Sequence, residues 1–118
     1  MKYLCLIYDE ERQMSAMSKS ESDAFMGEYM SFTDGIAKGG QFLAGEALLP
    51  VNTATTVRLR NGKLTTTDGP FAETKEQLGG FYLIEANDLN EAIQIAARIP
   101  SARTGSVEVR PVMVFDQP

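Results

Sequence analysis

The chain has 118 residues, of which 43% are hydrophobic and 23% are charged, and this composition is typical of one soluble globular domain, residues 1–118. The net charge is −5 and the basic residues form no run, so we expect no direct contact with nucleic acid. No apolar stretch approaches the ~20 residues that cross a membrane, so we expect no membrane partner either.

The sequence contains no histidine and one cysteine, Cys5. No side chain therefore titrates near neutral pH unless its surroundings perturb it. Ser-His-Asp and Cys-His nucleophiles, histidine-containing metal sites and thiolate clusters are excluded, and we expect neither a metal nor a cofactor. A lone cysteine also excludes an intramolecular disulfide framework and favours a cytoplasmic location.

The first third of the chain predicts a strand, a helix and a second strand. Residues 2–8 form a strand pattern with two apolar faces, and residues 9–17 indicate a polar loop. Two capping boxes, starting at Ser18 and Ser20, compete for the start of a helix that should end at Gly39-Gly40. A second strand is expected over residues 41–49. The helix carries one apolar stripe, made of Phe25, Tyr29, Phe32 and Ile36.

The segment ATTVRLRNGKLTTT predicts a β-hairpin with Asn61-Gly62 as a type I′ turn. This register sets Leu59 opposite Leu64 and Arg60 opposite Lys63. Two like charges facing each other are tolerated only on an exposed ribbon, so we expect the hairpin to be exposed.

The last third repeats the strand–helix–strand order. A strand with two apolar faces is expected over residues 77–86, followed by a helix that Asp88 caps and Pro100 ends. The final strand pattern covers residues 106–115. Pro111 interrupts it, which favours an edge position or a bulge.

The order of elements predicts an α+β fold, a ferredoxin-like βαββαβ arrangement with an inserted β-hairpin. Right-handed crossovers would place both helices on the same face of one four-stranded sheet. The strands are apolar on both faces, whereas the helices cover only one of them. We therefore expect a homodimer that forms through the uncovered apolar sheet face.

The stretch DGPFAETKEQLGGFYLIE, residues 68–85, resembles the signature of the DGPF group within the YCII-related (YciI-like) family. Three flanking stretches are similar to the same group: MKYLCLIY, GGQFLAGEALLPVNTATTVRLRNGK and ARIPSARTGSVEVRPVM. The resemblance implies a dimeric α/β barrel of ferredoxin-like protomers. The wider family includes a dehydrochlorinase that acts on a hydroxylated, chlorinated aromatic ring with a His-Asp pair. Asp68 matches the DGPF aspartate, but this sequence has no histidine to complete such a pair.

Two carboxylates are candidate catalytic residues. Asp68 can act as a general base at the rim of a cleft, or its carboxylate can simply stabilise the Gly-Pro turn that follows. Glu46 lies inside the apolar stretch QFLAGEAL. It must either pair with an arginine, reach solvent at a strand edge, or face a pocket, because an unpaired buried charge is costly. The candidate arginines are Arg58, Arg98 and Arg103.

Three further residues are candidate ligand-binding residues. Lys75 belongs to the charged run AETKEQ and can hold an anionic group if that loop folds over the sheet end. Tyr8 ends the first strand, where a phenol can donate a hydrogen bond to a ligand. Arg103 is an alternative anchor for an anion. Any pocket should lie between the helices and the sheet, or between the two protomers.

Two functions fit these observations. The first is a small dimeric α/β-barrel protein that serves as a binding or regulatory module or is a degenerate enzyme. DGPF-type proteins are often encoded beside alternative sigma factors, and the hairpin residues Arg58, Arg60 and Lys63 would suit an acidic regulatory protein. The second is a cofactor-free lyase or isomerase that uses carboxylates for acid–base chemistry on a small acid, either aromatic or not.

Overall fold

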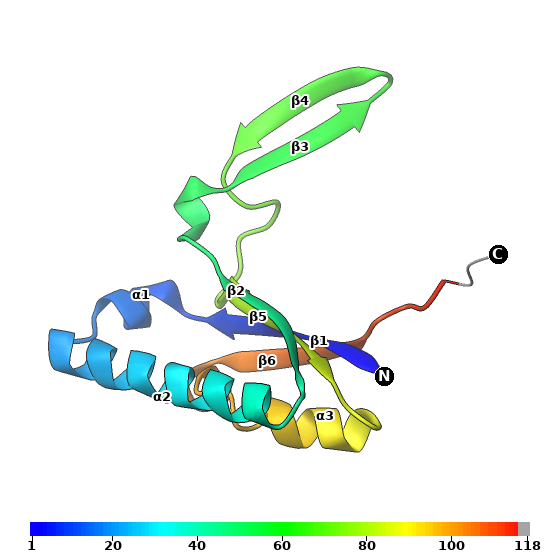
Figure 1. Ribbon diagram of the computed structural model, residues 1–118. Coiled ribbons are helices and arrows are strands. Elements are labelled where there is room, and N and C mark those ends of the chain that lie inside the picture. Colours follow the sequence, from blue (N-terminus) through cyan, green and yellow to red (C-terminus); the bar gives the residue numbers. More distant parts are fainter. Residues whose placement is uncertain (116–118) are drawn as a thin grey trace.

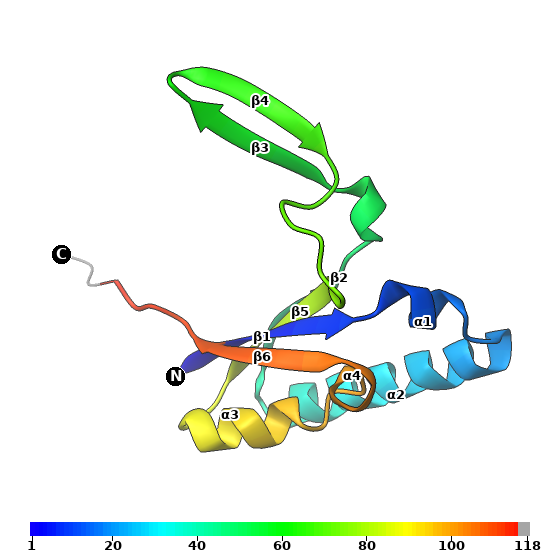
Figure 2. The ribbon, with the colours of Figure 1, turned by 180° about the vertical axis from the view of Figure 1, so that it is seen from behind.

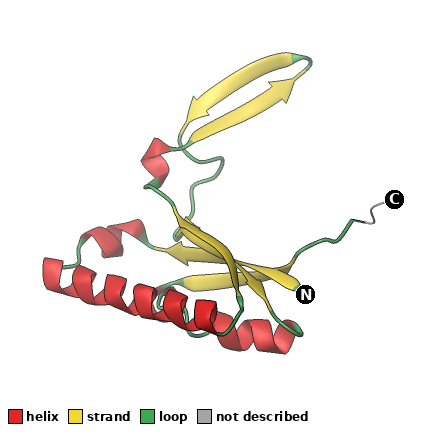
Figure 3. Ribbon diagram, viewed as in Figure 1, coloured by secondary structure: helices red, strands yellow, loops and turns green. Residues whose placement is uncertain are grey.

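The computed structural model describes residues 1–115 and shows a mixed α+β fold with two antiparallel sheets (Figures 1 and 3). The main sheet has the strand order β2-β5-β1-β6. Its strands are β1 (Lys2–Asp9), β2 (Phe42–Ala47), β5 (Gln77–Glu85) and β6 (Ser106–Pro111). The second sheet pairs β3 (Thr55–Arg60) with β4 (Lys63–Asp68). The helices are α1 (Glu11–Ser15), α2 (Lys19–Lys38), α3 (Leu89–Ala96) and α4 (Ser101–Thr104), and a 3-10 turn, η1, covers Val51–Thr53.

Side-chain caps fix the starts of the two longer helices. At α2 the Ser18 side chain accepts a hydrogen bond from the Glu21 backbone N–H at 3.1 Å, and the Glu21 carboxylate accepts one from the Ser18 N–H at 3.0 Å. Of the two competing capping boxes, the one at Ser18 therefore starts the helix. The Asp88 carboxylate caps α3 by accepting from the Glu91 N–H at 2.8 Å, as predicted.

Three predicted elements need correction. The helix predicted to end at Pro100 ends at Ala96, and Pro100 instead precedes the short helix α4. The segment predicted as a loop over residues 9–17 contains the short helix α1, which buries no side chain and so leaves no apolar periodicity in the sequence. The strand predicted over residues 106–115 ends at Pro111, which lies at the end of an edge strand, as the proline suggested. Just beyond Pro111, the Val112 N–H still donates a hydrogen bond to the Lys2 carbonyl of β1 at 3.0 Å.

The hairpin β3–β4 has the predicted register. Leu59 pairs with Leu64 and Arg60 with Lys63, and both turn residues have positive φ, 53° at Asn61 and 74° at Gly62. Figures 1 and 2 show this hairpin projecting away from the main sheet, on the side opposite the helices. We call β3–β4 the arm.

The hydrophobic core lies between the main sheet and the helices α2 and α3 (Figure 1). Alternate residues of β1 and β5 point into it, together with Phe32 and Ile36 of α2. Cys5 is fully buried in this layer, and burial raises the pKa of its thiol to about 11. The thiol is therefore a core group that stays protonated at neutral pH.

The opposite sheet face has no helix over it. Leu4 pairs with Leu83 and Leu6 with Phe81, and these four side chains form a half-buried apolar strip on that face. The radius of gyration is 16.5 Å, whereas a compact chain of this length has a value of about 13.5 Å. The arm, which projects away from the main sheet, contributes to this difference. Within residues 1–115, no helix has both the length and the hydrophobicity to cross a membrane.

Candidate functional site

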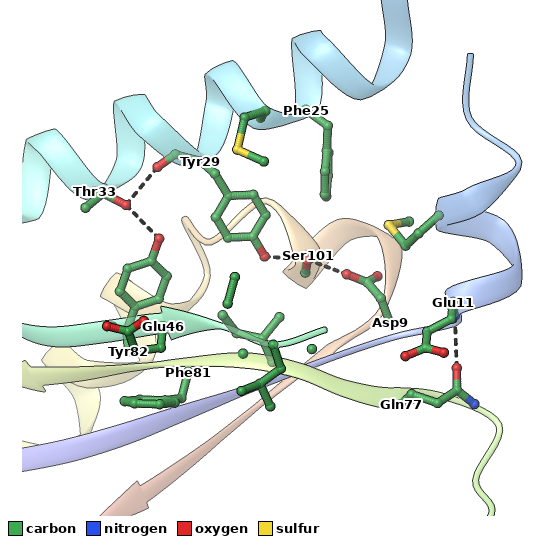
Figure 4. A pocket seen from close by; sticks show the side chains of 18 of the residues that line it. Asp9, Glu11, Phe25, Tyr29, Thr33, Glu46, Gln77, Phe81, Tyr82 and Ser101 are labelled. Atoms are coloured by element: carbon green, nitrogen blue, oxygen red, sulfur yellow. Dashed lines mark hydrogen bonds between the residues drawn. The ribbon is translucent and has the colours of Figure 1, made fainter. Parts of the chain in front are cut away.

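A wide groove of about 1390 Å³ runs between α2 and the β2–β5 edge of the sheet, and α1 and η1 extend its walls (Figure 4). Its walls are mostly apolar. The α2 side contributes Phe25, Met26 and Met30, and the sheet side contributes Phe42 and Tyr82. Met26 and Met30 are exposed although they lie on the groove. Large apolar concavities with a few polar groups are the usual form of small-molecule sites.

A hydrogen-bonded chain of three side chains reaches the groove. Asp9 ends β1, Ser101 begins α4 and Tyr29 lies in the middle of α2, so the fold brings together residues up to 92 positions apart (Figure 4). The Ser101 hydroxyl donates to Oδ2 of Asp9, and the Tyr29 and Ser101 oxygens lie 2.5 Å apart. Oδ1 of Asp9 accepts from the Thr104 hydroxyl at 2.6 Å. Ser101 is only 1% exposed, so the centre of the chain is closed to solvent.

The direction of these bonds follows from the number of protons. A hydroxyl has one proton, and Ser101 gives its proton to the Asp9 carboxylate, which can only accept. Tyr29 must therefore donate to Ser101. Burial raises the pKa of the Tyr29 phenol, and the negative charge of Asp9 acts in the same direction although the bond to Ser101 opposes it. The phenol is thus protonated at neutral pH, and its remaining lone pair is free to accept.

A second tyrosine, Tyr82, also donates its hydroxyl proton to a protein group. The Thr33 hydroxyl donates to the Tyr29 backbone carbonyl at 2.9 Å, so Tyr82 must donate to Thr33, whose oxygen lies 2.6 Å from the Tyr82 oxygen. Gly45 makes room for this ring, because a Cβ at that position would lie 2.8 Å from the Tyr82 Cδ1 atom. Both phenol groups line the groove with their protons already engaged in the protein.

The charged groups on the groove are mainly acidic. Asp9, Glu11, Asp34 and Glu46 line it, and Arg12 is the one basic residue among the lining side chains in residues 1–115. Glu11 also connects the walls, because its backbone N–H donates to Gln77 at 2.9 Å and its carboxylate accepts from the Val51 N–H at 3.0 Å. This excess of negative charge disfavours the carboxylic acid ligand that the sequence suggested.

Of the two predicted catalytic carboxylates, the structure places only Glu46 on the groove. Glu46 is exposed on the edge strand β2. In the described part of the chain it forms no ion pair with an arginine: Arg103 pairs with Glu28 at 2.8 Å, and Arg98 lies over the Phe32 ring at 5.7 Å. Asp68 ends β4 at the base of the arm, where it is exposed and outside the groove lining.

The predicted ligand-binding residues also lie outside the groove. Lys75 is exposed in the loop between β4 and β5. Tyr8 alternates with the core residue Ile7 along β1, so it faces the uncovered side of the sheet. Arg103 lies in α4 and is exposed beside Glu28 on a different surface. None of Asp68, Lys75, Tyr8 and Arg103 is therefore among the residues that line the groove.

The sequence did not single out Asp9, Ser101 or Thr33, and it indicated Tyr29 only as a core residue. One signal was present for Asp9, which comes directly after a strand that is apolar on both faces. The contact with Ser101 had no signal in the sequence, since it depends on how α4 returns to the end of β1. In residues 1–115, no three acidic or cysteine side chains gather as a metal site.

Comparison with known proteins identifies the family. The model of the YCII-related domain family matches residues 1–116. An uncharacterised protein of Rhizobium meliloti is 39% identical over 117 residues, covering 98% of this chain and 94% of that protein. The fold is also similar to the solved structure of 5-chloro-2-hydroxyhydroquinone dehydrochlorinase from Burkholderia phenoliruptrix in complex with 2,5-dihydroxybenzoquinone. That similarity has a TM-score of 0.57 and 12% identity, and covers 96% of this chain and 94% of the other, so it concerns the fold alone. The family match and the R. meliloti relative together show that this chain belongs to the YCII-related domain family.

Proposed function

We propose that the protein binds a small uncharged molecule in the groove between α2 and the β2–β5 edge. The observation that carries this proposal is the groove itself, a large concavity with aromatic and methionine walls and a few fixed polar groups. The structurally similar dehydrochlorinase was solved with a small ring compound bound, which supports a small-molecule ligand as the starting hypothesis. The acidic lining favours an uncharged ligand over an anionic one.

Binding of an uncharged fluorescent probe, N-phenyl-1-naphthylamine, tests the proposal. We expect saturable binding to the wild type. The double variant Met26→Asp/Met30→Asp should bind at least about tenfold more weakly, because two carboxylates replace apolar contacts and ~1.4 kcal/mol corresponds to a factor of ten. Both methionines are exposed, so the variant should fold.

The control variant, Ser22→Asp/Gln94→Asp, adds the same charge at exposed helix positions away from the groove. It should bind the probe as the wild type does. Equal weakening in the two double variants would show that net charge, rather than the groove, controls binding, and would contradict the proposal.

The Asp9–Ser101–Tyr29 chain favours a second candidate function, cofactor-free proton transfer on the bound molecule. In this hypothesis a ligand hydroxyl gives its proton to Tyr29, Tyr29 gives its own proton to Ser101, and Ser101 gives its own to Asp9. The ligand becomes an anion and Asp9 becomes neutral, so the charges balance. Asp9→Asn is the decisive variant: any turnover found for the wild type should disappear while the uncharged probe still binds. Turnover that persists in Asp9→Asn would reject the role of Asp9.

The uncovered sheet face supports the proposal of a homodimer. Two ferredoxin-like protomers would close a dimeric α/β barrel by packing their apolar strips, which contain Leu4, Leu6, Phe81 and Leu83, against each other. Light scattering at micromolar concentration should then give twice the 12.9 kDa mass of the chain. A particle of 12.9 kDa at this concentration would argue against the dimer.

Two finer proposals concern the arm and its neighbourhood. The first is that the chain belongs to the DGPF group of the family. It rests on the stretch DGPF at residues 68–71 and on the similar stretches before and after it in the sequence. The arm is also proposed to bind a regulatory protein with an acidic surface, because Arg58, Arg60 and Lys63 of the arm are all exposed. Replacing these three residues with serine should abolish capture of such a partner and leave binding in the groove unchanged.

A further inference from the structure

The two tyrosines on the groove offer hydrogen-bond acceptors, although a phenol is commonly regarded as a donor. Tyr29 donates its proton to Ser101 because Ser101 gives its own to Asp9. Tyr82 donates its proton to Thr33 because Thr33 gives its own to the Tyr29 carbonyl. Each phenol oxygen has a further lone pair, and a phenol with its one proton engaged can only accept from a ligand.

The surrounding residues fix the direction of these hydrogen bonds. Ser101 is 1% exposed, so water has little access to the centre of the first chain, and the Tyr29 carbonyl, which can only accept, fixes the direction of the second. Asp9 fixes the direction of the first chain, since an ionised carboxylate has no proton to donate. Among residues 1–115, Asp9 and Glu11 add acceptor oxygens to the same groove, and Arg12 adds the one charged donor.

We infer that the groove selects uncharged ring compounds that carry hydroxyl groups as hydrogen-bond donors, and that it rejects both their methyl ethers and their anions. A methyl ether has no proton to donate to Tyr29 or Tyr82, so it lacks the hydrogen bond that the phenol can make with these oxygens. A phenolate has no proton to donate and is also repelled by the carboxylates. This inference rests on the proposed small-molecule function of the groove and names its ligand class.

The test compares two probes of nearly the same shape, 4-nitrophenol and its methyl ether 4-nitroanisole, in titrations of the wild-type protein. Below the pH at which the free phenol ionises, 4-nitrophenol should bind about 2- to 12-fold more tightly than the ether, as expected for one net hydrogen bond. Above that pH its affinity should fall, and the bound phenol should ionise at a higher pH than the free one. The absorbance of nitrophenolate reports this ionisation directly.

Tyrosine-to-phenylalanine variants show which tyrosine causes the preference for 4-nitrophenol over its methyl ether. The preference for the phenol should fall in Tyr29→Phe, in Tyr82→Phe or in both, whereas Tyr8→Phe on the uncovered sheet face should keep it. The comparison of the two probes in the wild type needs no variant, so it remains valid if a variant unfolds.

The outcomes separate this inference from the function on which it rests. Equal binding of phenol and ether, or tighter binding of the phenolate, would overturn the inference and leave the groove as an apolar binding site. A preference that survives in both groove variants and disappears in Tyr8→Phe would also overturn it. Binding of neither probe, together with no binding of N-phenyl-1-naphthylamine, would refute the proposed function itself.

Discussion

Replacing Gly105 with alanine is expected to lower the free energy of unfolding by about 3 kcal/mol or more, at the upper end of the range for overpacked sites. A Cβ at this position would lie 2.0 Å from the Tyr8 carbonyl oxygen, 2.7 Å from Oδ1 of Asp9 and 3.0 Å from the Asp9 Cα atom. Two of these three atoms belong to the backbone of β1, an interior strand of the sheet, and cannot move aside without disturbing its pairing. Urea denaturation measures the change.

Gly27→Ala is the matched control. Gly27 lies inside α2, and an added Cβ would meet no atom within 4 Å. Alanine should therefore raise the free energy of unfolding by about 0.5–1 kcal/mol, because it reduces the freedom of the unfolded chain. If Gly105→Ala were as stable as the wild type, the close approach of α4 to the end of β1, and with it the position of Asp9, would be wrong.

Ser101→Ala should lower the free energy of unfolding by about 1–3 kcal/mol. The substitution removes the one hydroxyl that connects Tyr29 to Asp9, and leaves a tyrosine proton and a carboxylate oxygen without their partner. The residue is buried, so water cannot readily replace the lost hydroxyl. Ser22→Ala, at an exposed position on α2, should change the free energy of unfolding by no more than about 0.5 kcal/mol.

A double-mutant cycle shows whether Ser101 and Tyr29 act together. In the Ser101→Ala background the phenol has already lost its acceptor, so Tyr29→Phe should cost less there than in the wild type. A coupling energy of about 0.5–3 kcal/mol is expected for residues in one hydrogen-bond network. Strictly additive effects would contradict the chain of hydrogen bonds from Tyr29 to Asp9.

Much of the fold could be predicted because the responsible signals are local. The capping box at Ser18, the Asn61-Gly62 turn and the Asp88 cap each act over four residues or fewer, and the structure has all three. The short helices α1 and α4 were missed for a related reason. Neither has the length for a 3.6-residue apolar pattern to be recognised, and α1 buries no side chain.

The site was harder to predict because its contacts are not local. Glu46 attracted attention through the cost of placing a carboxylate in an apolar strand, and the structure places it on the groove. Asp68 attracted attention through its motif, but in the protomer it lies at the base of the arm. Asp9 meets Ser101 across 92 residues, and Tyr29 meets Ser101 across 72, so only the assembled sheet and helices reveal the chain they form.

The central claim is that the groove, and not the DGPF segment, is where a ligand binds. Amide chemical shifts of the isotope-labelled protein, recorded during titration with 4-nitrophenol, test it most directly. We predict that the largest shifts occur at groove residues on three different elements, Tyr29, Tyr82 and Ser101, with Gly45 beside them. Shifts confined to Asp68, Lys75 and the arm, with the groove residues unchanged, would contradict the claim.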